Sequence, residues 1–231
     1  MRVRPSSAPA NGILVVNKPR GMTSHDAVDF ARRKLATRKV GHAGTLDPGA
    51  TGVLVLLVGD CTRLFDSFMK LDKEYEAEVA LGKKTSTADS SGRVLEERDC
   101  SHVTRAMVEK ALTGFLGAIR QVPPMVSAVK HKGTRLYKLA RRGASVERAA
   151  RTVVIKELRL LSFSPPHFRL FVKCSRGTYV RQLAEDLAAA LGCVGHISEI
   201  KRLSVGPHSL DNALALEEIS PEKVLPVTAI P

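Results

Sequence analysis

Hydrophobic residues recur along the chain with a period of two in some stretches and of three to four in others. Short apolar runs at Ile13 to Val16 and Val53 to Val58 predict two buried strands. From Tyr75 to Leu81, apolar residues alternate with glutamates, which predicts a strand with one buried and one wet face. The tyrosine that starts this stretch is therefore expected to point inward.

Helical patterns follow recognisable capping residues. Thr23 and Asp26 predict a capping box for a helix that runs to about Ala36, and Thr178 is expected to cap a helix that ends near Leu191. The other expected elements are a short strand before Gly41, a short helix carrying Leu64, Phe65 and Phe68 on one side, a loop from Lys83 to Gly92, a strand near Val94, a helix from Thr104 to Leu116, a hairpin of Val153 to Phe163 with Phe168 to Cys174, a strand from His196 to Val205, and a short helix near Ala213 to Ile219.

This succession predicts an α+β fold, with a mixed, mainly antiparallel central sheet flanked by helices. We expect one domain over residues 12–231, preceded by a disordered basic tail at residues 1–11 that is rich in proline and serine. The longest strongly apolar run, Val53 to Val58, is far shorter than the ~20 residues that cross a bilayer. The sequence therefore predicts a soluble, cytoplasmic protein.

The charge balance points to a polyanionic partner. Lys and Arg number 36 against 23 Asp and Glu, a formal net charge of +13. A merely soluble basic protein or a membrane-surface binder would share this composition, but the excess is concentrated between Lys130 and Arg151, where Glu147 is the single acid. The basic residues of this stretch are Lys130, Lys132, Arg135, Lys138, Arg141, Arg142, Arg148 and Arg151. Because apolar residues are few there, the stretch resembles a surface that grips phosphates more than one that inserts into a membrane.

The four cysteines form no CxxC pair and lie far apart in the sequence, so we expect buried, reduced thiols. Cys193 and His196 have a spacing seen in metal sites, but two ligands cannot supply the four of a structural zinc. We therefore expect no metal.

The loop GHAGTLDPGATG, from Gly41 to Gly52, is the strongest candidate for chemistry. Its four glycines allow the backbone to approach a ligand closely, and Pro48 disfavours helical geometry at Asp47. An aspartate that only bonds neighbouring N–H groups of a turn is the alternative interpretation. A phosphate-binding P-loop is disfavoured, because the GK[ST] ending is missing.

Arg181 falls in the first turn of the helix predicted after Thr178, where the helix dipole disfavours a cation. A carboxylate such as Asp47 would compensate for this, and the pairing would keep that carboxylate ionised. The alternative is an i,i+4 pair between Arg181 and Glu185 on a solvated face. His42 could stack on a base, although taken alone it would be an ordinary surface histidine.

Four stretches together resemble the TruB family of tRNA pseudouridine synthases. They are LVVNKPRGMTSHDAV, VGHAGTLDPGATGVL, DKEYEAEVALGKKTSTADSSG, and SRGTYVRQLAEDLAAALG followed by IKRLSV. Their order and spacing span nearly all of residues 12–225, and GHAGTLDPGATG together with RGTYVR is highly specific. The resemblance implies the pseudouridine synthase fold and isomerisation of the T-loop uridine at tRNA position 55, without cofactor or metal.

The resemblance also implies roles for particular residues. Asp47 would be the catalytic aspartate, Arg181 its ion-pair partner, and Tyr75 the aromatic that stacks on the target base. The remaining expected substrate contacts are His42, Tyr179, Ile200 where a leucine is usual, Lys18 in the first stretch, and Arg141 and Arg142 within a basic RNA-gripping insertion at about residues 124–152.

The expected partner is the T-arm stem-loop of tRNA, bound by a monomer with no membrane and no obligate protein partner. Many members continue into a small C-terminal RNA-binding domain of PUA type, which we expect to be missing here, so that the basic insertion carries more of the binding. Whether the aspartate attacks the sugar or the base, or removes a ribose proton, stays open. A noncatalytic RNA-binding module and a metal-dependent nuclease are the alternative functions.

Overall fold

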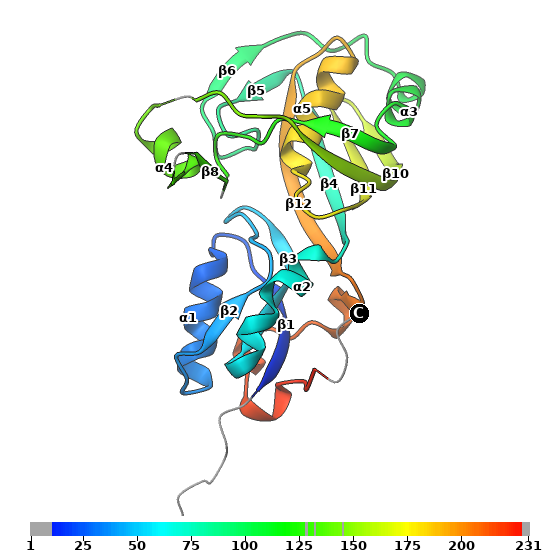
Figure 1. The fold of residues 1–231 in the computed structure, drawn as a ribbon. Helices are drawn as coiled ribbons and strands as arrows, with labels where there is room; N and C mark the ends of the chain where they lie inside the picture. Colours follow the sequence, from blue (N-terminus) through cyan, green and yellow to red (C-terminus); the bar gives the residue numbers. More distant parts are fainter. Residues whose placement is uncertain (1–10, 128, 132, 145, 228–231) are drawn as a thin grey trace, which may run out of the picture. The chain divides into compact units, whose positions relative to one another are not determined.

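The computed structural model describes residues 11–127, 129–131, 133–144 and 146–227 (Figure 1). The predicted tail falls almost wholly on residues 1–10, which lie outside the described part. The chain divides into two compact units, residues 1–73 with 201–231 and residues 74–200. No helix in the described ranges is long and apolar enough to cross a membrane.

The sheet of the first unit has the order β1-β3-β12. Strand β1 (Gly12–Lys18) runs antiparallel to β3 (Thr51–Val58). Strand β12 (Gly195–Val205) pairs in parallel with β3 through Lys201 and Arg202. The short strand β2 (Val40–His42) pairs with β3, and the short strand β13 (His208–Ser209) pairs with β12. Every residue of β3 after the first is buried, as expected for a strand predicted from an unbroken apolar run.

Helix α1 (Ser24–Lys34) begins at Thr23, and the capping box predicted with Asp26 is present. The expected one-sided helix after β3 is a 3-10 turn, η1 (Gly59–Leu64), followed by α2 (Phe65–Lys70). Phe68 is buried in the core of this unit, but Phe65 is exposed, so the predicted apolar stripe is wrong at that position. The expected final helix is replaced by three 3-10 turns, η2 (Leu210–Asn212), η3 (Leu216–Glu218) and η4 (Pro221–Lys223).

In the second unit, strands follow the order β12-β4-β11-β10-β7. The bounds are β4 Lys73–Leu81, β7 Gly117–Gln121, β10 Arg151–Ser164 and β11 His167–Cys174. The predicted hairpin of β10 and β11 is confirmed, with two register shifts. Strand β12 is parallel to β3, whereas the pairings of β1 with β3, β10 with β11 and β10 with β7 are antiparallel. The mixed, mainly antiparallel sheet and the α+β class are therefore confirmed.

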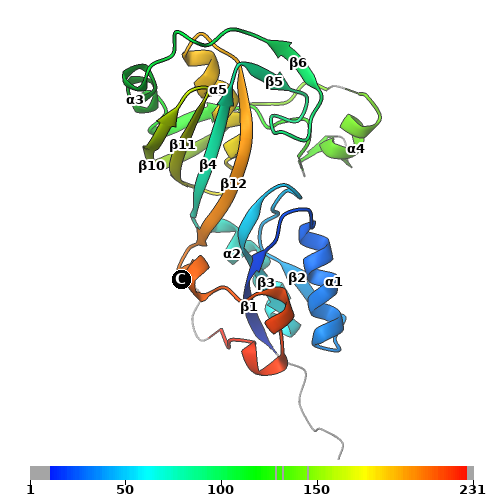
Figure 2. The ribbon, with the colours of Figure 1, turned by 180° about the vertical axis from the view of Figure 1, so that it is seen from behind.

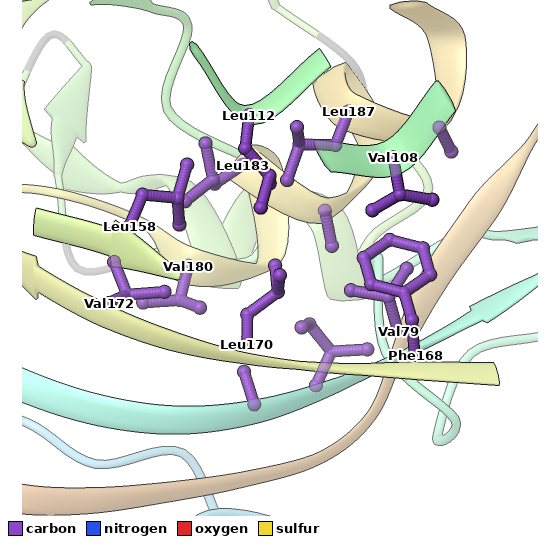
Figure 3. Packing of buried hydrophobic residues seen from close by; sticks show 14 of the residues in the cluster. Val79, Val108, Leu112, Leu158, Phe168, Leu170, Val172, Val180, Leu183 and Leu187 are labelled. Carbon is purple, nitrogen blue, oxygen red and sulfur yellow. The ribbon is translucent and has the colours of Figure 1, made fainter. Parts of the chain in front are cut away.

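Two helices pack on one face of this sheet and close its hydrophobic core. They are α3 (Arg105–Thr113), capped by Thr104, and α5 (Val180–Ala190). Figure 3 shows Leu183 and Leu187 of α5 and Val108 of α3 packed over the inward side chains of the sheet, among them Phe168 and Leu170. The apolar stripe predicted for α5 is therefore confirmed. Burial of such a stripe is what holds an amphipathic helix on a sheet.

The remaining segments of this unit are a hairpin and a basic excursion. The loop predicted at residues 83–92 is in part a strand, β5 (Lys83–Thr85), paired with β6 (Val94–Glu97). The basic excursion consists of β8 (Lys130–His131), β9 (Thr134–Arg135) and α4 (Leu136–Arg141). In Figures 1 and 2, α4 and α3 lie at opposite sides of the unit.

Two further local predictions are wrong. The α5 cap residue is Tyr179, and the hydroxyl of Thr178 instead donates to the carbonyl oxygen of Ser175 at 2.9 Å, which closes the preceding turn. Cys100 and Cys193, expected to be reduced thiols, form a disulfide between residues 93 positions apart. Sequence spacing could not show this pairing, because only the packing of α3 and α5 brings their flanking loops together.

Candidate active site

The loop that carries Asp47 is held by main-chain contacts on both sides of this residue. The hydroxyl of Ser24, at the start of α1, accepts from the N–H of Leu46 at 2.8 Å and donates to its carbonyl oxygen at 3.0 Å. After Asp47, the N–H of Gly21 donates to the carbonyl oxygen of Pro48 at 2.8 Å. Because the residues before and after it are fixed, the Asp47 backbone is pre-organised and its side chain stays partly exposed.

A buried arginine fastens the first half of the same loop. Arg202 on β12 is 1% exposed, and its guanidinium donates to the carbonyl oxygens of Val53 at 2.7 Å, Gly44 at 3.1 Å and Thr45 at 3.4 Å. Gly44 and Thr45 lie directly before the Leu46–Asp47 segment. The Arg202 side chain therefore joins strand β3 to the glycine-rich loop. Its buried charge is satisfied by hydrogen bonds to these carbonyl oxygens.

Two of the loop glycines have backbone conformations that a residue with a side chain would adopt only with strain. Gly44 has a φ of +99° and Gly52 a φ of +101°, values that residues with a Cβ rarely adopt. At Gly52, a Cβ would also lie 2.2 Å from the carbonyl oxygen of Arg202. At Gly52 the close approach of backbone serves the packing of β3 against β12. The approach to a ligand that the glycines predict stays a prediction.

Lys18, at the end of β1, is fully buried in the first unit. Its ammonium donates to the carbonyl oxygens of Pro19 at 2.8 Å and Met22 at 2.7 Å. Burial lowers the pKa of Lys18 from 10.5 to about 8, while the nearby carboxylate of Asp47 acts in the opposite direction. Lys18 and Asp47 thus belong to one electrostatic neighbourhood.

In the second unit, Tyr75 on β4 has its predicted inward orientation. It is 9% exposed and belongs to the hydrophobic core of this unit. Ile200 on β12 is partly buried and packs against the same core.

Arg181 occupies the first turn of α5, as predicted, and is 4% exposed. Its guanidinium donates to the carbonyl oxygens of Thr87 at 2.6 Å and Val126 at 2.8 Å, and its Nε lies 3.9 Å from an oxygen of Asp89. The alternative of a solvated pair with Glu185 is wrong, because Arg181 is buried. These three contacts, all within the same unit, offset part of the cost of placing a cation at a helix N-terminus.

Tyr179 immediately precedes α5 and is partly exposed. Both of its main-chain polar groups bond to the side chain of Gln121. His42, on β2 of the first unit, pairs with Leu56 of β3 and is also partly exposed.

Exposed cations gather in the predicted basic insertion. Arg135, Lys138 and Arg142 are exposed, whereas the side chains of Lys130, Lys132 and Arg141 lie outside the described part. Arg148 has a structural contact, since it donates to the carbonyl oxygen of Pro123 at 3.0 Å.

The predicted residues form two groups, one in each unit. Asp47, Lys18 and His42 belong to the first, and Tyr75, Tyr179, Arg181, Ile200, Arg141 and Arg142 to the second. Sequence reasoning assigned no role to Arg202, Asp89 or Gln121, although the first two stand in the stretches quoted above. Gln121 carried no signal beyond its place before Pro123 and Pro124. Among the described side chains, no three His, Cys, Asp or Glu residues group as metal ligands would.

Two family models together match residues 32–225 of the chain. Residues 32–180 match the model of the TruB family pseudouridylate synthase N-terminal domain. Residues 181–225 match that of the tRNA pseudouridylate synthase B C-terminal domain. A protein named tRNA pseudouridine synthase B from Symbiobacterium thermophilum is 50% identical over 221 residues, which are 94% of this chain and 74% of the relative. Its namesake from Pseudomonas aeruginosa is 49% identical over 209 residues, 90% of this chain and 68% of the relative.

Solved structures show the same fold. The chain matches one in "Crystal Structure of a Cbf5-Nop10-Gar1 Complex" with a TM-score of 0.71 and 28% identity, over 90% of this chain and 53% of that one. A second, in "Structure of H/ACA RNP bound to a substrate RNA containing 2'-deoxyuridine", gives a TM-score of 0.68 at 24% identity, over 91% and 52%. This chain spans about half the length of those two.

Proposed function

The chain belongs to the TruB family of pseudouridylate synthases, which makes it an isomerase that converts uridine in tRNA to pseudouridine, and from this premise we propose its target and its reacting group. The target is the T-loop uridine at tRNA position 55. The reacting group is the carboxylate of Asp47, and the reaction uses neither a metal nor a cofactor.

The isomerisation places modest chemical demands on the protein. The bond from ribose C1′ to uracil N1 breaks, a bond from C1′ to C5 forms, the C5 hydrogen leaves as a proton, and N1 takes up a proton. No atom is oxidised or reduced overall, and no external reagent is consumed. A single positioned carboxylate that acts on the sugar or the base is sufficient for such a sequence.

The observation that carries the proposal is the fixed backbone on both sides of Asp47. Ser24 holds the preceding residue through two hydrogen bonds, and Gly21 holds the carbonyl oxygen of the following residue. A turn aspartate that only stabilises its own loop would not need this support from α1 and from the segment after β1. A reacting carboxylate does need it, because small displacements of a reacting group cost large factors in rate.

Residues of the second unit would complete the reaction. We assign Arg181 as the ionic partner of Asp47 and Tyr75 as the ring that stacks on the uracil. Tyr179 and Ile200 would line the base pocket. From the first unit, His42 would occupy the space of flipped nucleotides. Support comes from the buried, firmly bonded guanidinium of Arg181 and from the inward face of β4 on which Tyr75 lies. Extruding the base costs a few kcal/mol, which stacking and phosphate contacts would offset.

The basic insertion would grip the T-arm. Exposed Arg135, Lys138 and Arg142 supply cations for backbone phosphates, and we include Arg141 on the basis of its sequence position. Lys18, first expected to contact the substrate, is assigned a supporting role beside Asp47, because its ammonium is buried and bonded to two carbonyl oxygens.

We assign the protein to the cytoplasm. We also propose that it acts as a monomer. Sedimentation velocity with and without tRNA tests this. A one-to-one complex is expected, and a complex with two protein chains would contradict it.

The deciding experiment uses a T-arm hairpin that carries tritium at uridine C5. Wild-type protein is expected to release the label with EDTA present, and Asp47→Asn to release none. Asp29→Asn is the matched control, since Asp29 lies on α1 and pairs with Arg32 at 2.9 Å. Label release that persists in Asp47→Asn would overturn the assignment, and EDTA-sensitive strand cleavage would indicate a nuclease instead.

A further inference from the structure

The side chain of Gln121 makes a paired contact with the backbone of a residue 58 positions away. It stands at the end of β7 and is 1% exposed. The N–H of Tyr179 donates to Oε1 of Gln121 at 2.7 Å, and Nε2 of Gln121 donates to the carbonyl oxygen of Tyr179 at 3.0 Å. The carboxamide thus pairs with Tyr179 in the way that one strand residue pairs with another.

The contact between Gln121 and Tyr179 lies at the N-terminus of helix α5, where the cap residue makes no side-chain capping bond. Tyr179 is the cap residue, with a φ of −103° and a ψ of 103°, and no side chain caps the helix from that position. The hydroxyl of Thr178 bonds instead to Ser175. Since bonds to both the N–H and the C=O of Tyr179 restrict its two backbone dihedrals, Gln121 fixes the direction in which the tyrosine side chain leaves the chain.

The same segment reaches the helix a second time. Five residues after Gln121, the carbonyl oxygen of Val126 accepts from Arg181 at 2.8 Å. Pro123 and Pro124 lie buried between these two points, and Arg148 bonds to the carbonyl oxygen of Pro123. Because proline fixes φ, this short segment is stiff and sets the spacing of its two anchor points.

We propose that Gln121 is a positioning residue for the isomerisation: its carboxamide orients Tyr179 and the first turn of α5, and thereby the base pocket and Arg181. This inference rests on the proposed function for the roles of those two residues. Gln121 itself need not touch the tRNA.

The test compares two substitutions at this position in single-turnover tritium release. Gln121→Met keeps the volume and removes both hydrogen bonds, so the rate is expected to fall about tenfold to a hundredfold. Affinity for a T-arm hairpin should stay within twofold, because the phosphate contacts are elsewhere. A rate within twofold of wild type would overturn the proposal.

Gln121→Glu gives a readout that a packing role would not produce. The ionised carboxylate can accept from the Tyr179 N–H but opposes its carbonyl oxygen, whereas the protonated acid can donate to that oxygen again. Burial raises the pKa of such a group. The rate of this variant relative to wild type should therefore rise as the pH falls from 8 to 6, while the ratio for Gln121→Met stays constant. A deficit in Gln121→Glu that does not change with pH would contradict the proposal, and this variant remains informative if Gln121→Met does not fold.

The matched control is Gln182→Met. Gln182 is an amide on the same helix, and its Nε2 donates to Asp186 at 2.9 Å. Losing that bond leaves the Tyr179 backbone untouched, so the rate should match wild type.

A spectroscopic measurement separates this inference from the proposed function. The chain has three tyrosines and no tryptophan. With 3-fluorotyrosine incorporated and the signals assigned by Tyr→Phe variants, Gln121→Met should shift the fluorine resonance of Tyr179 and leave that of Tyr137 in place. If wild-type protein released no tritium, the proposed function would fail while this resonance still tested the contact. An unmoved Tyr179 resonance would overturn the positioning role even in an active enzyme.

Discussion

Gly52 and Arg202 face each other across the parallel strands β3 and β12, so closely that a Cβ on Gly52 would lie 2.2 Å from the carbonyl oxygen of Arg202. The side chain of the same arginine returns to the glycine-rich loop and bonds to Gly44 and Thr45. One residue pair thus determines both where the Asp47 loop ends and how its first half is held.

Gly52→Ala is expected to destabilise the protein by about 2 kcal/mol or more, because the new methyl group meets backbone and the φ of +101° is strained for alanine. Urea unfolding measures the change. Gly49→Ala is the control, since a Cβ there meets no atom within 4 Å, and its effect should stay within about 0.5 kcal/mol. Equal stabilities of the two variants would show that β12 can move away from β3 at little cost.

Arg202→Met should lower the free energy of unfolding by about 2 to 4 kcal/mol, since three carbonyl oxygens lose a charged donor inside the protein. At temperatures where the variant is folded, tritium release should also slow, because the loop before Asp47 loses its fastening. Lys201→Met, which changes the exposed neighbour on the same strand, is the control. A variant with full activity and lowered stability would restrict Arg202 to a structural role.

Much of this arrangement could be anticipated from local patterns. The alternation from Tyr75 to Leu81 predicted the inward face of β4, and the capping box at Thr23 located the start of α1. These succeed because periodicity and capping are properties of neighbouring residues. The same reasoning predicted that Thr178 caps α5. This prediction failed because the Thr178 hydroxyl bonds to the carbonyl oxygen of Ser175 in the preceding turn.

Contacts between distant residues could not be anticipated in this way. Nothing near Gln121 indicates a partner 58 residues later, and nothing near Cys100 indicates Cys193. Arg202 looks like one more cation of a basic chain until its burial is known. The family resemblance named candidate reacting groups, but the residues that hold them in place emerged only from the packing.

The pH dependence of the free energy of unfolding should reveal the burial of the Lys18 ammonium. Its pKa falls from 10.5 to about 8 on folding, so below pH 8 it is charged in both states and the folded protein bears the cost of burying the charge. Between pH 8 and 10.5 the unfolded chain binds more protons, and stability gains from this residue as the pH rises. The gap corresponds to about 3 kcal/mol.

Comparison with Lys18→Met isolates this effect, because other titrating groups are common to both proteins. The free energy of unfolding of wild type minus that of the variant should increase from pH 7.5 to 10.5, by up to about 3 kcal/mol. Urea unfolding at several pH values measures it. A difference that stays constant would show that the Lys18 ammonium is not desolvated in the folded protein.

The basic insertion makes a prediction about salt. Reversing charge in Arg141→Glu/Arg142→Glu should weaken binding of a T-arm hairpin and reduce the slope of log affinity against log salt by about 1 to 2, because each lost phosphate contact releases about one counterion fewer. Filter binding at several salt concentrations measures both quantities. The control is Lys110→Glu on α3, an exposed cation at the side of the unit opposite α4 (Figure 1). If instead the slope changed in Lys110→Glu and not in the double variant, the phosphate-binding face would include α3, and the enrichment of cations between Lys130 and Arg151 would not mark the RNA site.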